Sequence, residues 1–161
     1  MPEVIADTSV LQYLHQTDHL QLLPALYGKI LVPRGVAEEI REGRSLGHPL
    51  PDLEALNWVT VVSAHERREL EPSTDLGEGE RQALALAIEN PGATVLLDDA
   101  LARRVAERLG IAFTGTLGVL LRAKAAGHLT SIAPVVHELE ERGFRLARET
   151  RSAILELAGE E

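Results

Sequence analysis

The segment Glu3–Leu14, EVIADTSVLQYL, combines a strand pattern with the start of a helix pattern, and these two patterns alternate along the chain. Residues 4–6 form a short apolar run that is typical of a buried strand, Asp7 follows it, and apolar residues at helical spacing begin after two hydroxyl residues. An Asp at this position can cap the helix that follows it. It can also belong to a ligand site, because ligands bind at the carboxyl ends of strands in open α/β sheets. The segment alone leaves both roles open.

The composition indicates one globular domain. The 161 residues are 45% hydrophobic and 25% charged and include no cysteine, which excludes disulfides, thiol catalysis and Cys-ligated zinc. The net charge of −9 argues against broad, non-specific binding of nucleic acid, although acids that hold cations also count toward this total. We find neither an apolar run long enough to span a membrane nor a basic leader before an apolar stretch, and so expect a cytoplasmic protein without membrane contact.

Strand and helix patterns alternate along the sequence. The predicted strands are residues 3–7, 29–33, 57–64, 93–99 and 111–115. The predicted helical segments are residues 8–28 with a break near 16–18, then 34–43, 71–92, 100–110, 116–129, and a C-terminal segment from about 131. This alternation predicts a three-layer α/β/α sandwich with a central, mostly parallel sheet, formed by a single domain over residues 1–161.

Two acidic positions fall at the ends of predicted strands. Asp7 and Asp98 each end a strand, and Asp99 follows Asp98 directly. Because the carboxyl ends of parallel strands share one edge of the sheet, we expect these carboxylates to meet there. The alternative is that Asp98 or Asp99 caps the next helix.

Two helices add further candidates. Glu80 continues the apolar stripe of its helix, whereas Glu78 has more polar helical neighbours. An acid at the end of a buried face is costly unless it is paired or binds a metal, which favours Glu80; the alternative is that Glu80 only stabilises the helix N-terminus from the solvent side. In the helix over 34–43, Glu39 lies closer to the apolar side than Glu38, and a solvated surface acid is the alternative there too.

Five segments then occur in a specific order: VIADTSVL, LVPRGVAEEI, LGEGERQALALA, TVLLDDALARRVA and TGTLGVLLRAK. This series, which runs roughly from Val4 to Leu129, resembles the PIN-domain superfamily and is most similar to the DUF3368 group of predicted nucleic-acid-binding proteins. Each motif is common by itself; their order and spacing carry the resemblance.

The resemblance implies a catalytic metal site of acidic side chains: Asp7, Glu39, Glu80 and Asp98, with Asp99 as a fifth metal ligand. It implies hydroxyl groups that orient ligands or water: Thr8, Ser9 and Thr116. We further expect Arg103, in the helix after the acidic pair, to contact the substrate backbone. One position departs from the family pattern, because Leu96 stands where many PIN nucleases have Thr or Ser. Either Thr114 or Thr116 takes over that role, or activity is low.

An all-oxygen ligand set suits Mg²⁺ or Mn²⁺. The implied activity is therefore metal-dependent hydrolysis of phosphodiester bonds, with single-stranded RNA as the expected substrate. The resemblance also raises the hypothesis that the protein is the toxin of a toxin–antitoxin pair, held by a small antitoxin protein. The competing hypothesis is a PIN-like module that binds RNA or a protein without cleaving it. The apolar helix at 116–129 and the C-terminal segment fit a homodimer, but ordinary core packing explains them equally well.

Overall fold

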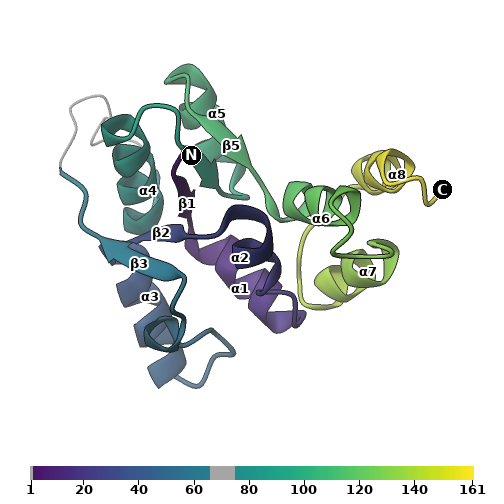
Figure 1. Cartoon of the computed structure of the whole chain (residues 1–161), viewed down its shortest axis with the longest axis horizontal. Coiled ribbons are helices and arrows are strands. Elements are labelled where there is room, and N and C mark those ends of the chain that lie inside the picture. Colours follow the sequence, from purple (N-terminus) through teal and green to yellow (C-terminus); the bar gives the residue numbers. More distant parts are fainter. Residues whose placement is uncertain (1, 66–74) are drawn as a thin grey trace.

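A computed structural model describes residues 2–65 and 75–161. Strands and helices alternate through most of this part of the chain (Figure 1). The strands are β1 (Val4–Ala6), β2 (Ile30–Pro33), β3 (Val59–Val62), β4 (Thr94–Leu96) and β5 (Ala112–Thr114). The α-helices are α1 (Thr8–Gln16), α2 (Leu22–Tyr27), α3 (Arg34–Ser45), α4 (Glu78–Glu89), α5 (Ala100–Arg108), α6 (Thr116–Ala125), α7 (Ala133–Glu141) and α8 (Arg148–Leu157), and a short 3₁₀ helix, η1 (Leu53–Ala55), precedes β3.

The sheet has the order β3-β2-β1-β4-β5 and all of its pairings are parallel. The chain builds outward from β1 in one direction and then returns to add β4 and β5 on the other side. The boundary between β1 and β4 is therefore the point at which the strand order reverses, and ligands bind at the carboxyl ends of strands at such a point. Ala6 lies opposite Leu96 in the register, so Asp7 leaves β1 next to the end of β4.

Side chains alternate between the two faces of the sheet, as the strand period requires. Val4 and Ala6 belong to a core that also includes buried residues of α1, α2, α3, α6 and α7. Ile5 belongs to a second core, on the opposite face, with buried residues of α4 and α5. The predicted three-layer α/β/α sandwich with a parallel central sheet is confirmed.

Several predicted boundaries are corrected. The helix from residue 34 continues past Gly43 to Ser45, because the chain turns out of the helix at Gly47, which has a φ of +89°. The strand predicted over 93–99 ends at Leu96, so Asp98 lies two residues beyond it. The helix predicted from residue 71 begins at Glu78, and its predicted start at 71–74 lies outside the described residues.

The C-terminal segment is also divided, into α7 and α8, by a turn over residues 142–147. These helices lie together with α6 at one side of the sheet (Figure 1). The carboxylate of Glu160 fixes the end of the chain to this group, since it accepts hydrogen bonds from Lys124 Nζ (2.8 Å) and Ser131 Oγ (2.7 Å). It also accepts the N–H groups of Ile132 and Ala133 at the start of α7. These donors, Lys124 first, lower the pKa of Glu160 to about 2.

Candidate active site

The five acidic side chains predicted to form a site come from four parts of the fold and line one cavity of about 790 Å³. Asp7 follows β1, Asp98 follows β4, Glu39 comes from the middle of α3, and Glu80 from the first turn of α4. Asp99, the residue before α5, lines the same cavity. The structure therefore brings together all five carboxylates that the sequence suggested, at the reversal point of the sheet.

Asp7 is the most buried of these acids, with only 4% of its surface exposed. It occupies the N-cap position of α1, yet its side chain makes no capping hydrogen bond. Burial raises the pKa of Asp7 to about 7 from 3.8; the N–H of Thr8 opposes this shift. Three carboxylate charges add to it: Glu80, Glu39 and Asp98. A nearby positive charge, such as that of a bound cation, would favour the ionised form of this buried carboxyl.

The carboxylate of Glu39 connects three elements. Its Oε2 accepts the hydroxyl of Thr8 at 2.7 Å, and its Oε1 accepts the N–H of Gly79 at 3.1 Å. This approach depends on glycine at position 79, because a Cβ there would lie 2.7 Å from Glu39 Oε1 and 3.0 Å from a methyl of Val36. Glu38, the other candidate on α3, lines a different cavity.

Glu80 and Glu78 point in different directions, as the helical pattern predicted. Glu80 Oε1 accepts the N–H of Gly77 at 2.9 Å, next to the acidic cavity. Burial raises the pKa of Glu80, with opposition from the Gly77 N–H and smaller contributions from the charges of Asp99 and Glu39. Glu78 is exposed and accepts Gln82 Nε2 at 3.0 Å instead.

Asp98 and Asp99 are held by different donors. Thr116 donates to both oxygens of Asp98, its N–H to Oδ1 at 2.8 Å and its hydroxyl to Oδ2 at 2.7 Å. Asp99 accepts the N–H of Ala102 at 2.9 Å and is therefore the N-cap of α5. The capping alternative thus holds for Asp99, whose side chain nevertheless reaches the cavity.

The three predicted hydroxyl residues lie beside the carboxylates. Thr8 and Thr116 donate to Glu39 and Asp98, as given above. The hydroxyl of Ser9 is buried and has no hydrogen-bond partner among the described residues, although Ser9 lines the acidic cavity. A buried hydroxyl usually has a hydrogen-bond partner. A cation bound by the neighbouring carboxylates, or water bound to that cation, would provide one for Ser9.

The acidic side chains nevertheless do not have the arrangement of ligands around one metal ion. Among the described residues, no three Asp, Glu or His side chains are placed so that they could hold one metal ion together. The carboxylates of Glu39, Glu80, Asp98 and Asp99 instead accept hydrogen bonds from N–H or hydroxyl groups of the protein. The donor set is suitable for Mg²⁺ or Mn²⁺ in composition, since it consists of carboxylate and hydroxyl oxygens.

Arg103 is partly buried and packs against neighbouring groups of the protein. Its Nε donates to the carbonyl of Leu97 at 3.1 Å, and its guanidinium lies over the ring of Phe113, 5.3 Å from the centroid. It lies close to Asp98, since a Cβ on Gly115 would contact both its guanidinium and Asp98 Oδ1. Arg103 is not among the residues that line the cavity, and its contact with a substrate stays a prediction.

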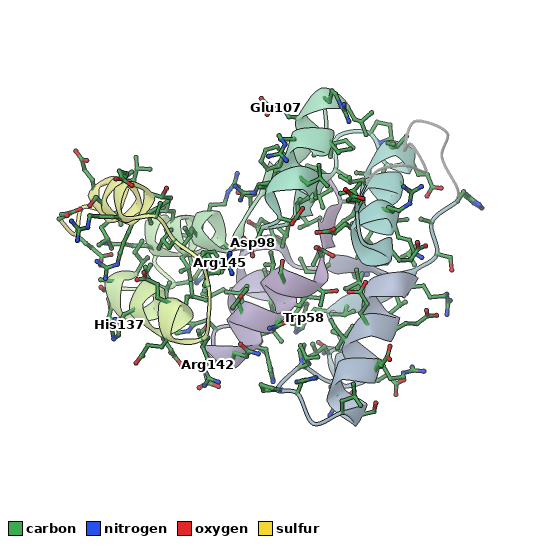
Figure 2. The ribbon with its side chains drawn as sticks, turned by 180° about the vertical axis from the view of Figure 1, so that it is seen from behind. Trp58, Asp98, Glu107, His137, Arg142 and Arg145 are labelled. Carbon is green, nitrogen blue, oxygen red and sulfur yellow. The ribbon has the colours of Figure 1, made fainter. Side chains whose placement is uncertain are left out.

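The cavity has a second wall that we did not predict from the sequence. Gln12 and Tyr13 contribute from α1, and Gly143, Phe144 and Arg145 from the turn between α7 and α8. Arg145 and Asp98 line this same cavity, and Figure 2 labels both residues. The only signal in the sequence is the scarcity of aromatic residues, which makes each one notable; their spacing gives no indication that they meet.

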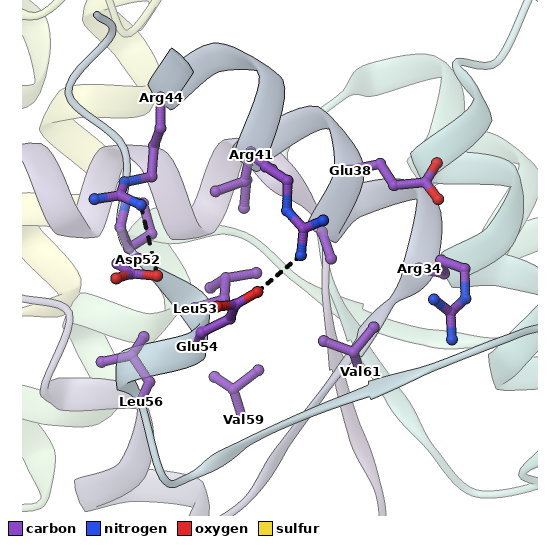
Figure 3. A pocket seen from close by; sticks show the side chains of 13 residues that line it. Arg34, Glu38, Arg41, Arg44, Asp52, Leu53, Glu54, Leu56, Val59 and Val61 are labelled. Atoms are coloured by element: carbon purple, nitrogen blue, oxygen red, sulfur yellow. Dashed lines mark hydrogen bonds and ion pairs between the residues drawn. The ribbon is translucent and has the colours of Figure 1, made fainter.

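A second cavity, of about 510 Å³, lies between α3, η1 and β3 (Figure 3). Its basic groups face acidic ones: Arg41 binds Glu54 at 2.8 Å and Arg44 lies 3.5 Å from Asp52. Charges in this cavity therefore balance one another locally, unlike those around Asp7.

No described helix is both long and apolar enough to cross a membrane. A comparison with curated proteins finds no match. The model of the DUF3368 family, described as a PIN domain, matches residues 3–160. This match covers both the acidic cavity and the C-terminal helices that complete its second wall. The chain therefore belongs to the DUF3368 family of PIN domains.

Proposed function

We propose that the protein is a divalent-metal-dependent nuclease that hydrolyses phosphodiester bonds, with single-stranded RNA as its substrate. PIN domains are generally nucleases that use divalent metals, which gives the reaction class. The observation that carries the proposal for this chain is the convergence of three carboxylates from separate parts of the fold, Glu39, Glu80 and Asp98, around the buried Asp7. Folding these like charges together is unfavourable, and a bound cation is the simplest compensation.

In this proposal Asp7 and Asp98 hold the ion, and Glu39 and Glu80 hold water or a second ion. A bound Mg²⁺ or Mn²⁺ would acidify water and offset the negative charge that builds on the phosphate. Thr116 fixes both oxygens of Asp98, and Thr8 fixes Glu39, so that these carboxylates lose little freedom when they bind a ligand. Water attacks phosphorus and its proton passes to a carboxylate or to solvent. The bond from phosphorus to the leaving oxygen breaks, and that oxygen takes up a proton from solvent.

One observation favours a second candidate, a PIN module that binds RNA or a protein without cleaving it. The described carboxylates do not form an arrangement in which three of them could hold one metal ion together. Cleavage therefore decides between the two candidates.

The decisive experiment compares the wild-type protein with Asp7→Asn on a defined single-stranded RNA, with and without Mn²⁺. We expect Mn²⁺-dependent cleavage by the wild type and none by the variant. Asn caps a helix almost as well as Asp, so an Asp7 that acted only as a cap would leave cleavage intact. Retained cleavage by a folded Asp7→Asn protein would contradict the catalytic assignment.

The cellular role extends the proposal further. We infer a cytoplasmic toxin that a small antitoxin protein inhibits, on the basis of the family resemblance. Co-purification with the product of a small adjacent reading frame would support it, and full activity in the presence of that product would contradict it. The homodimer proposal is tested by the mass of the protein in solution.

A further inference from the structure

An aromatic pair lines one side of the acidic cavity. The chain has two Tyr, two Phe and one Trp, and two of these five line the cavity. Tyr13 and Phe144 pack edge to face, with ring centroids 5.1 Å apart and planes at 78°. They come from opposite ends of the sequence, and both are only partly buried.

The turn after α7 places Phe144 at this position. Gly143 adopts a φ of +97°, which favours glycine, and this residue reverses the chain at the end of the helix. The N–H of Phe144 then bonds to the carbonyl of Leu139 at 2.9 Å. The backbone hydrogen bond and the contact with Tyr13 therefore both fix the position of the Phe144 ring.

Arg145, the next residue, is the one cationic side chain among the described residues that line this cavity. It is exposed and makes no hydrogen bond or ion pair within the described part of the chain. Arg142, in the same turn, does not line the cavity. A free guanidinium beside an aromatic pair and a metal-type acidic site is suited to a phosphate group.

We propose that Tyr13, Phe144 and Arg145 form a nucleotide-binding rim, where one base stacks on the aromatic pair and Arg145 binds an adjacent phosphate of the same strand. This inference rests on the proposed nuclease function and gives it a physical source of selectivity. Bases in a duplex have both faces covered by their neighbours, whereas single-stranded bases offer a free face to an aromatic platform. The rim therefore selects single strands, and it explains how an acidic protein binds a polyanion through a local contact.

The test measures binding of a short fluorescent single-stranded RNA and of the same RNA with an abasic nucleotide placed at each position in turn. Ca²⁺ replaces Mn²⁺ during binding, because it takes the same oxygen ligands, and cleavage in Mn²⁺ is measured separately. We expect the wild type to bind intact RNA about 5- to 100-fold more tightly than the least favourable abasic RNA. Phe144→Leu removes this preference, and Phe144→Tyr keeps it.

Arg145→Gln is expected to weaken binding of intact and abasic RNA equally and to lower the salt dependence by about one phosphate contact. Arg142→Gln is the matched control, because it removes the same charge three residues away. It should change neither the affinity for RNA nor the salt dependence of binding. Circular dichroism verifies folding. If Phe144→Leu does not fold, Phe144→Trp replaces it, and its fluorescence should be quenched by intact but not by abasic RNA.

Two results would overturn the inference, and they are distinguishable. If the wild type cleaves RNA in Mn²⁺ but binds intact and abasic RNA equally, the rim is not a base site and the proposed function stands. If the wild type neither binds nor cleaves RNA, the nuclease proposal fails and the rim proposal fails with it.

Discussion

Replacing Asp7 with Asn should make the metal-free protein more stable, and most strongly at neutral and alkaline pH. Asp7 is 4% exposed, and its pKa rises from 3.8 to about 7 in the folded protein. The folded state therefore binds a proton more tightly than the unfolded chain. Stability contributed by the protonated carboxyl is present below the unfolded pKa and is lost as the pH rises through the folded pKa.

The structure sets the size of this effect. Each unit of pKa shift corresponds to about 1.4 kcal/mol, so an ionised Asp7 lowers the free energy of unfolding by about 2–4 kcal/mol at neutral pH and above. Asn has nearly the same shape, carries no charge, and can donate its amide hydrogens to the surrounding carboxylates. We expect Asp7→Asn to recover most of that energy, which corresponds to an increase in Tm of about 5–15 °C in a domain of this size.

The assay is thermal and urea unfolding in the presence of a chelator, at about pH 5 and about pH 8. The raised pKa predicts that Asp7→Asn gains less stability over the wild type at the lower pH than at the higher pH. Asp52→Asn is the matched control, because Asp52 is about half exposed and lies 3.5 Å from Arg44 at the surface. Its removal should change stability by less than about 1 kcal/mol. The reasoning is refuted if Asp7→Asn is no more stable than the wild type at the higher pH, or if its gain is the same at both pH values.

Three further predictions concern the same site and its support. Mn²⁺ should raise the Tm of the wild type by mass action and raise that of Asp98→Asn less; the absence of a shift at millimolar metal would favour the binding module. Glu80→Gln should lower the cleavage rate at saturating Mn²⁺ about 10- to 100-fold. Glu78→Gln, which makes the same charge change on the exposed side of the helix, should cleave at nearly the wild-type rate. Equal losses in the two variants would refute the assigned helix orientation. Glu160→Gln should lower the free energy of unfolding by about 1–3 kcal/mol. Because the pKa of Glu160 is lowered from 4.5 to about 2, the wild type should lose this contribution as the pH falls through that range, and the two proteins should become equally stable. A stability difference that stays the same between neutral pH and about pH 2 would contradict the role.

Most of the fold could be predicted because short apolar runs and helical stripes depend on local sequence. The errors occur where local sequence allows two conformations. Gly43 can end a helix but is accommodated within one, and Gly47 provides the turn instead. Asp98 extends an apolar run, yet its carboxylate is held by Thr116 beyond the strand, and the strand ends two residues earlier.

The acidic half of the site was predictable for a different reason. Positions after parallel strands converge on one edge, so Asp7 and Asp98 are expected to meet whatever the details of packing. The aromatic wall was not predictable, because Phe144 and Arg145 reach the cavity through the packing of α6, α7 and α8. No periodicity in the sequence encodes that packing, which depends on contacts such as the one between Lys124 and Glu160.

The structure also supports an answer to the question that Leu96 raises. Leu96 is fully buried in the core formed with α1 and α6, so its position serves packing and not the cavity. Thr116 donates both its N–H and its hydroxyl to Asp98, whereas the hydroxyl of Thr114 lies against the backbone of Gly118. The orientation of Asp98 therefore comes from the first residue of α6. Thr116 therefore supplies the contact to Asp98 for which a hydroxyl residue at position 96 would otherwise be needed.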